Sequence, residues 1–248
     1  RDDVESRGLG DVYKRQVQRS SSVSQTYDCT RPGGDEAGLA AALSAVKGGR
    51  LVVIPTDTVY GIGADAFDND AVASLLKAKH RGPDYPTPVV VGSWDTVTGL
   101  VRDADSRLRT LVEAFWPGGL TVVTHQAPSL PWNLGDTRGT VALRMPLHPL
   151  AVALLRQTGP MALSSANVHG RPPALTAAQA REQLGDSVSV YLDGGRATVG
   201  TASTIIDLSG RHPRILRRGA VDPARIAEVL EVSEESLTGE PAEPGARG

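Results

Sequence analysis

Three cations gather where a predicted helix ends. Lys77, Lys79 and Arg81 occupy alternate positions of KAKHRGPDYP, which passes from a helical pattern into a loop rich in proline and glycine. Ammonium and guanidinium groups bind phosphate oxygens through charge-assisted hydrogen bonds. The helix dipole also favours cations at this end, by about 0.3–1 kcal/mol. The segment is therefore either a phosphate-binding loop or a charge-stabilised helix end.

Two threonines flank an aspartate directly after the apolar run LVVI. If the strand continues through PTDTVY, alternation places the hydroxyls of Thr56 and Thr58 on one side and the carboxyl of Asp57 on the other. Two hydroxyls at a strand end form a hydrogen-bonding ledge for a ligand. The alternative is structural, because threonine favours strands and a turn follows.

Small polar side chains also lie at two later strand ends. Ser165 and Asn167 in MALSSANVHG can donate hydrogen bonds to an anion, or build a turn. GTASTIIDL begins in a similar way, with Ser203. The sequence thus places hydrogen-bonding groups at three strand ends.

Arg144 lies in TVALRM, on a largely apolar predicted strand. A buried arginine is costly unless it is paired. We expect Arg144 to meet either an internal carboxylate or a carboxylate or phosphate of a ligand.

Several common catalytic signatures are missing or misplaced. GIGADA, residues 61–66, has the glycines of a dinucleotide fingerprint, but TDTVY separates it from the preceding strand. The P-loop and G-x-S-x-G patterns do not occur, and the five histidines lack metal-ligand spacing. Cys29 is the single cysteine, so an internal disulfide is excluded. We expect no metal site built by the protein and no serine nucleophile.

The elements that must position these side chains alternate between helical and strand periods. Helices are predicted from about Glu36 to Gly48, from about Asp70 to Ala78 with Asn69 as N-cap, and over 94–114, 149–157, 175–184 and from Asp222 onward. Two of them begin with capping signals, at Thr176 and at Asp222. Apolar runs at 51–54, 88–91, 120–123, 140–145, 160–164, 189–192, 203–208 and 214–217 predict strands.

This interleaving predicts one α/β domain with a mixed sheet, over residues 36–232. Residues 1–35 are expected to be a disordered extension, or an artefact of how the reading frame was assembled. Their mixed charges and lack of an apolar core indicate neither a secretory signal nor a membrane anchor. Residues 233–248 are expected to form an acidic disordered tail.

The net charge of −2 conceals a gradient along the chain. Residues 38–225 carry 19 Lys and Arg against 15 Asp and Glu, whereas residues 226–248 carry one against six. A mildly basic body suits an anionic ligand such as a nucleotide, but it lacks the dense basic stripe of a nucleic-acid binder. No apolar run approaches membrane-helix length, and one cysteine fits a reducing cytoplasm.

Taken together, these segments resemble the YrdC/Sua5 family, the L-threonylcarbamoyladenylate synthases, in its short form with the YrdC-like domain alone. The matching motifs occur in order over about residues 38–221. They are PTDTVYGIGADA, KHR at 79–81, FWPGGLT, TVALRMPLHP, SSANVHG, DGG at 193–195, GTASTIIDL and ILRRG.

The resemblance implies an α/β domain whose twisted mixed parallel/antiparallel sheet is flanked by helices around a concave, positively charged cavity. It implies a nucleotidyltransferase that condenses L-threonine, bicarbonate or CO2 and ATP to threonylcarbamoyl-AMP and pyrophosphate. A downstream threonylcarbamoyl-transferase complex would then modify adenosine 37 of tRNAs that read ANN codons. Mg2+ would arrive with ATP rather than in a protein cage.

The resemblance also implies roles for ten residues. The catalytic pair would be Lys79 and Arg81, which neutralise phosphate charge. The ATP-binding residues would be Lys79, Arg81, Thr140, Ser165, Asn167 and Arg217. The L-threonine-binding residues would be Thr56, Thr58, Arg144 and Ser203, with Arg144 on the substrate carboxylate. Nucleotidyl transfer needs alignment and charge neutralisation more than a protein nucleophile. The absence of a serine-nucleophile motif is therefore compatible with this activity.

The chain departs from the family pattern at a few positions. KHRG replaces K-x-R-P, Tyr85 replaces a common polar residue, and His169 replaces the serine before a glycine. One alternative is a non-catalytic RNA-binding module, which the low aromatic content of 4% disfavours. Another is a carbamoyl-transferring relative, which normally carries acylphosphatase-like and zinc-finger segments; a single cysteine excludes the zinc-finger segments here. Weak RNA binding by the synthase itself is a further possibility.

Overall fold

Strands and helices alternate along the chain, as the sequence predicts. The computed structural model describes residues 24–238. The strands are β1 (Gln25–Asp28), β2 (Val52–Ile54), β3 (Gly61–Asp65), β4 (Val89–Val90), β5 (Leu120–His125), β6 (Thr140–Arg144), β7 (Met161–Ser165), β8 (Val190–Asp193), β9 (Thr204–Asp207) and β10 (Arg214–Arg217). The helices are α2 (Gly34–Lys47), α3 (Asn69–Ala78), α4 (Trp94–Thr98), α5 (Ser106–Phe115), α6 (Pro149–Thr158), α7 (Ala177–Leu184), the 3-10 turn η1 (Gly185–Ser187), α8 (Pro223–Leu230) and α9 (Glu234–Thr238).

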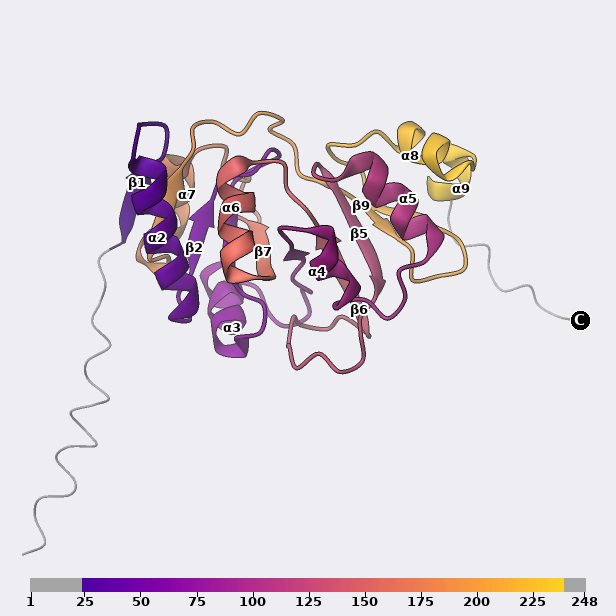
Figure 1. The fold of residues 1–248 in the computed structure, drawn as a ribbon, viewed down its shortest axis with the longest axis horizontal. Coiled ribbons are helices and arrows are strands. Elements are labelled where there is room, and N and C mark those ends of the chain that lie inside the picture. The colour runs from indigo at the N-terminus through magenta and orange to yellow at the C-terminus, as the bar shows by residue number, and fades with distance from the viewer. Residues whose placement is uncertain (1–23, 239–248) are drawn as a thin grey trace, which may run out of the picture.

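The strands form one mixed sheet with helices packed on it (Figure 1). Across the sheet their order is β1-β8-β2-β3-β7-β4-β6-β5-β9-β10. The pairs β1/β8, β2/β8, β4/β6 and β5/β9 are parallel, and the other neighbouring pairs are antiparallel. The predicted α/β fold with a mixed parallel/antiparallel sheet is therefore confirmed.

Side-chain alternation in β2 separates two hydrophobic cores. Val52 and Ile54 pack with α2 and α6, whereas Val53 packs with α3 and α7 on the opposite face. A third core lies among α4, α5, α8 and the strands β4, β5, β6 and β9. Because both faces of the sheet are covered around β2, this strand is a continuous apolar run, and such a run is recognisable in the sequence.

The folded domain extends beyond both predicted boundaries. Residues 25–28 form β1, which pairs in parallel with β8, so the expectation that 1–35 lie outside the fold is wrong here. This edge strand is mostly exposed and has no apolar alternation to reveal it. Helix α9 occupies part of the segment expected to be a disordered tail, because Leu237 is buried in the third core. Residues 1–23 and 239–248 of these segments lie outside the described residues.

The helix starts follow capping chemistry. Thr176 Oγ1 accepts from Gln179 N at 3.2 Å, and Asp222 Oδ1 accepts from Ala224 N at 3.0 Å, as predicted. The prediction of Asn69 as the cap of α3 is wrong by one residue. Asp68 caps this helix, accepting from the backbone N–H groups of its first turn.

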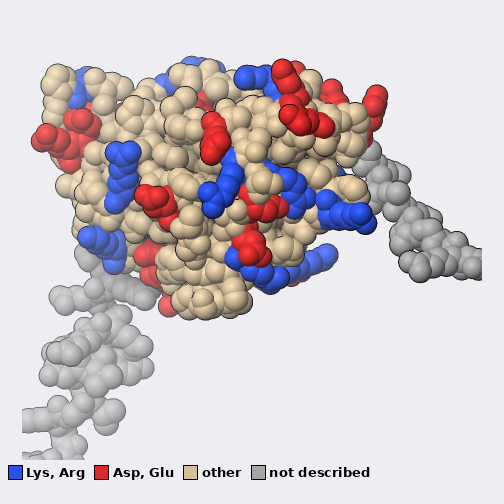
Figure 2. All heavy atoms as spheres, turned by 45° about the vertical axis from the view of Figure 1, so that its right-hand side comes forward, with Lys and Arg blue, Asp and Glu red and all other residues tan. Residues whose placement is uncertain are grey.

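The surface shown in Figure 2 carries Lys and Arg side chains interspersed with Asp and Glu. This face therefore shows no continuous basic stripe of the kind that a dedicated RNA-binding module presents. Within residues 24–238, no helix is both long and apolar enough to span a bilayer.

Candidate active site

Ends of several strands and the loops beside them surround one cavity of about 370 Å³. Its walls come from the segment after β2, the loop after α3, the ends of β6 and β7, and the starts of β5 and β9. Seven of the residues predicted from the sequence line it: Thr56, Thr58, Arg81, Arg144, Ser165, Ser203 and Arg217. Residues from distant parts of the chain thus meet at one place.

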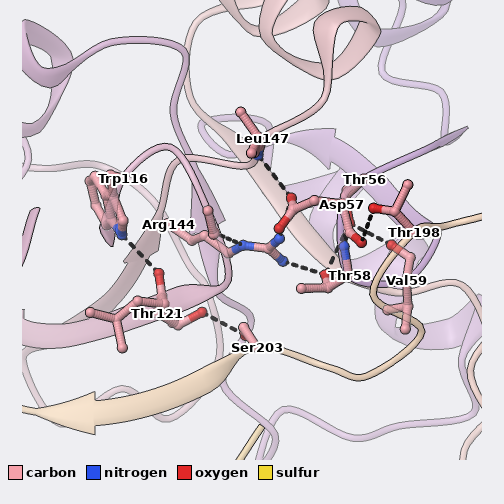
Figure 3. Close-up of polar contacts among 12 residues, drawn as sticks. Thr56, Asp57, Thr58, Val59, Trp116, Thr121, Arg144, Leu147, Thr198 and Ser203 are labelled. Carbon is pink, nitrogen blue, oxygen red and sulfur yellow. Dashed lines mark hydrogen bonds and ion pairs between the residues drawn. The ribbon is translucent and has the colours of Figure 1, made fainter. Parts of the chain in front are cut away.

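Arg144, the last residue of β6, is the most firmly held cation of the cavity (Figure 3). Its Nε donates to Gly118 O at 2.8 Å, Nη1 to Thr58 Oγ1 at 2.8 Å, and Nη2 to Asp57 Oδ1 at 2.7 Å. The side chains of Arg144 and Asp57 are 9% and 8% exposed, respectively. Burial lowers the pKa of Arg144, and the charge of Asp57 opposes this effect. The sequence predicted that Arg144 meets either an internal carboxylate or a group of a ligand. The internal carboxylate is that of Asp57.

Thr56 and Thr58 line the cavity and Asp57 does not, as expected, but the expected continuation of the strand is wrong. The chain does not continue as a strand after Ile54 but turns, because Thr56 Oγ1 donates to Val59 O at 2.6 Å and accepts from Thr58 N at 3.3 Å. In this turn, Asp57 and Thr58 both reach Arg144. Strict alternation of side chains therefore does not apply here.

Hydroxyl groups form the floor beside Arg144. Thr56 Oγ1 and Thr58 Oγ1 are 3.0 Å apart, which confirms that they share one side. Thr121 Oγ1 and Ser203 Oγ lie 2.8 Å apart on the neighbouring strand starts. The sequence analysis did not assign a role to Thr121. Its signal was a threonine at the start of a predicted strand, directly after the PGG turn.

Arg217, the last residue of β10, contacts Ser203. Its Nη2 donates to Ser203 O at 2.8 Å and to Ser203 Oγ at 3.1 Å, and its Nε donates to the same carbonyl at 3.1 Å. Burial, and next the positive charge of Arg81, lower the pKa of Arg217. Two like charges that destabilise each other across a cavity form a favourable site for an anion.

Arg81 is held more loosely than Arg144. Its Nε donates to His169 Nδ1 at 3.2 Å, and its guanidinium lies 5.2 Å from the centre of the Tyr85 ring. The rings of Tyr85 and His169 meet edge to face at 5.1 Å. Tyr85 is 40% exposed. Two of the positions at which the chain departs from the family pattern thus hold this cation.

Lys79 does not reach the cavity, in contrast to its predicted contact with phosphate. It is fully buried, and its Nζ donates to Ser165 O, to Asn167 O at 2.7 Å and to Asn167 Oδ1 at 3.4 Å. Burial, and next the charge of Arg81, lower the pKa of Lys79 to about 7. The lysine therefore ties the end of α3 to the segment after β7, and Ser165 of that segment faces the cavity.

Two other predicted ATP-binding residues also lie away from the cavity wall. Asn167 is buried and its Nδ2 donates to Arg171 O at 2.6 Å, which stabilises the loop after β7. Thr140 is at the opposite end of β6 from Arg144, where its Oγ1 donates to Thr137 O at 2.7 Å. Thr140 Oγ1 and Asn167 Nδ2 thus donate within local turns. For Asn167, this is the structural alternative considered from the sequence.

The comparison with known families decides the ancestry of this fold and cavity. The Sua5_yciO_yrdC family profile, described as "Telomere recombination", matches residues 44–219. The chain belongs to the Sua5/YciO/YrdC family. A Mycobacterium tuberculosis (strain ATCC 25618 / H37Rv) protein, provisionally named threonylcarbamoyl-AMP synthase, is 58% identical over 217 residues, which are 88% of this chain and 100% of that protein.

A solved structure of the family agrees with the fold. The crystal structure of P. abyssi Sua5 complexed with L-threonine aligns with a TM-score of 0.76 at 31% identity, over 84% of this chain and 62% of that one. The Pyrococcus abyssi (strain GE5 / Orsay) protein named threonylcarbamoyl-AMP synthase is 34% identical over 190 residues, which are 76% of this chain and 56% of that protein. This chain therefore spans little more than half of the archaeal relative.

Proposed function

We propose that this chain is a threonylcarbamoyl-AMP synthase, a nucleotidyltransferase that condenses L-threonine, bicarbonate or CO2 and ATP and releases pyrophosphate. The observation that carries the proposal is one cavity with two kinds of cationic site: a buried arginine among hydroxyls, and a pair of like-charged arginines. The names of the relatives and the threonine complex of P. abyssi Sua5 support the same assignment.

The amino-acid subsite of this proposal lies at Arg144. The substrate carboxylate binds the N–H groups of Arg144 that face the cavity, as planar guanidinium and carboxylate groups do. Thr56, Thr58 and Ser203 offer hydroxyls for the polar groups of threonine. The hydroxyl groups beside Arg144 suit a hydroxylated amino acid.

The nucleotide subsite lies at Arg81 and Arg217. These side chains neutralise the phosphates, and Ser165 contacts the nucleotide from the end of β7. Lys79 and Asn167 act indirectly in this proposal, by fixing the segment that carries Ser165. Mg2+ enters with ATP, whose phosphate oxygens supply its ligands. The residues described contain no group of three or more His, Cys, Asp or Glu arranged around a metal position.

The proposed reaction needs positioning rather than a protein nucleophile. The amine of threonine adds to CO2 to form a carbamate and releases a proton. A carbamate oxygen attacks the α-phosphorus, and the bond from that phosphorus to the bridging oxygen breaks, so pyrophosphate leaves. Because charge moves onto the leaving group, fixed cations beside it lower the barrier. The product is a mixed anhydride, suited to donate its threonylcarbamoyl group to adenosine 37 of tRNA in the cytoplasm through a downstream transferase complex.

Pyrophosphate release tests this function. The purified chain with Mg-ATP, L-threonine and bicarbonate should form pyrophosphate and threonylcarbamoyl-AMP in equal amounts, the latter measured by mass spectrometry. Arg31→Lys is a matched control, because Arg31 pairs with Asp28 at 2.7 Å on the exposed edge of the domain. This variant should be as active as the unchanged chain. Pyrophosphate release that is equal with and without threonine would refute the proposal.

A further inference from the structure

A carboxylate, that of Asp57, already contacts the arginine to which the proposed function assigns the carboxylate of the substrate. Asp57 contacts Arg144 through one oxygen, Oδ1, at 2.7 Å. A carboxylate beside Arg144 reduces the attraction of this end of the cavity for a second carboxylate. Its presence is therefore unfavourable for simple charge attraction, and an explanation must come from geometry.

The bonds of Arg144 show what that geometry achieves. A guanidinium has five N–H donors in one plane. Three of them donate within the described part of the chain, to Gly118 O, Thr58 Oγ1 and Asp57 Oδ1. These acceptors engage all three nitrogen atoms, so the side chain can neither slide nor rotate about its long axis. One hydrogen on Nη1 and one on Nη2 are not used by these three bonds.

Asp57 is itself firmly fixed. Its Oδ1 also accepts from Leu147 N at 2.8 Å, so one oxygen joins two segments. Its carbonyl oxygen accepts from Val199 N at 2.9 Å and from Thr198 Oγ1 at 3.2 Å. The aspartate is thus held by backbone and side chain together (Figure 3). A rigid acceptor of this kind transmits its position to the group that it binds.

We infer that Asp57 is a positioning residue: it fixes the plane of the Arg144 guanidinium so that the remaining N–H groups meet the carboxylate of L-threonine. The inference rests on the proposed amino-acid subsite. It assigns to Asp57 an effect on carboxylate recognition that comes from the place of its oxygen rather than from its charge. Charge and position can be separated by two substitutions.

Asp57→Asn keeps an oxygen at the Oδ1 position and removes the charge. Asp57→Glu keeps the charge and the ion pair but moves the oxygen by one methylene. Calorimetry on the full chain measures the affinities for L-threonine and for L-threoninamide, which lacks the carboxylate. In the unchanged chain, L-threonine should bind at least about tenfold more tightly than the amide, as expected for a charge-assisted bidentate contact.

The two variants should then differ. Asp57→Asn should keep this preference within about threefold, whereas Asp57→Glu should lose most of it, since a misplaced guanidinium cannot make both bonds. Far-UV circular dichroism and a cooperative thermal transition establish that each variant is folded. The matched control is Asp105→Asn. This change removes the negative charge of a surface carboxylate whose Oδ2 lies 2.6 Å from Arg107 Nη2. It should leave both affinities unchanged.

The outcomes distinguish this inference from the proposed function. If the unchanged chain does not prefer L-threonine over its amide, the proposed amino-acid subsite fails. If it does prefer L-threonine but Asp57→Glu keeps the preference, or Asp57→Asn loses it, the positioning role is refuted and the subsite stands. If Asp57→Glu does not fold, Asp57→Asn alone tests the positioning role. If the charge of Asp57 mattered, this variant would lose the preference for L-threonine over its amide.

Discussion

The two ends of the cavity hold their arginines in different ways. Arg144 is buried and donates to three acceptors on separate segments. Arg81, at the other end, has a histidine ring nitrogen and the face of an exposed tyrosine as its partners in the described residues. Arg144 is therefore rigid before a ligand arrives, whereas Arg81 can adjust.

This difference fits the two substrates that the proposal assigns. A small amino acid must be placed precisely, because its carbamate oxygen has to meet the α-phosphorus within a narrow range of angles. A triphosphate changes during the reaction, since pyrophosphate separates and leaves. An adjustable cation can follow that charge, whereas a fixed one would retain the product. The comparison predicts separate kinetic consequences at the two ends.

Replacement of Arg144 should have the largest effect. Arg144→Lys keeps one positive charge for Asp57 but cannot supply the planar set of donors. We expect kcat/KM for L-threonine to fall by about 10³-fold, or about 4 kcal/mol, while the affinity for ATP changes little. Steady-state kinetics with each substrate varied in turn measure this. A fall of less than tenfold would contradict the role of Arg144.

Replacement of Arg81 should reduce activity by a different route. Arg81→Ala should lower kcat/KM for ATP by about 10²-fold, because one cation that offsets phosphate charge is lost. In this variant, the affinity for L-threonine and the melting temperature should be unchanged, because the contacts of Arg81 are largely exposed. Equal losses for both substrates would show that the two ends are not independent. Arg138→Ala, at an exposed pair with Asp136, is the control.

Lys79 links stability to pH. Its folded-state pKa of about 7 lies below the ordinary lysine value of 10.5, so the unfolded chain binds more protons between these values. The contribution of this residue should therefore make the fold more stable as pH rises from about 7 toward 10, by about 1 kcal/mol per pH unit. Urea unfolding of the unchanged chain and of Lys79→Met, at several pH values, isolates this slope. Parallel pH profiles of the two proteins would rule it out.

The smallest effect should come from the partners of Arg81. His169→Ser removes the acceptor of Arg81 Nε and the ring that meets Tyr85. We expect KM for ATP to rise about two- to fivefold, as for the loss of one partly exposed hydrogen bond. Tyr85→Phe keeps the ring face and should have no such effect. An effect of His169→Ser as large as that of Arg81→Ala would mean that this end is as rigid as the other.

The sequence located most of the fold because its elements satisfy local rules. Thr176 and Asp222 begin helices as capping residues do, and buried strands read as apolar runs. The failures have physical causes. The exposed edge strand β1 carries no apolar pattern, and the burial of Leu237 in α9 depends on a core assembled from distant segments.

The site was predictable by residue type and less so by contact. Arg144 and Thr58 were recognised and lie in direct contact. The turn at Thr56 lets both Asp57 and Thr58 reach Arg144, which a continuing strand with alternating side chains would not. The burial of Lys79 could not be anticipated, because its acceptors are backbone carbonyls about ninety residues away in sequence. Backbone acceptors have no sequence signature.

A crystal structure with L-threonine and a non-hydrolysable ATP analogue bound tests the central claim most directly. The account predicts the threonine carboxylate within hydrogen-bond distance of Arg144, with that guanidinium still bound to Asp57, and the phosphates between Arg81 and Arg217. Phosphates bound at Arg144, or a threonine carboxylate bound at Arg81, would contradict it.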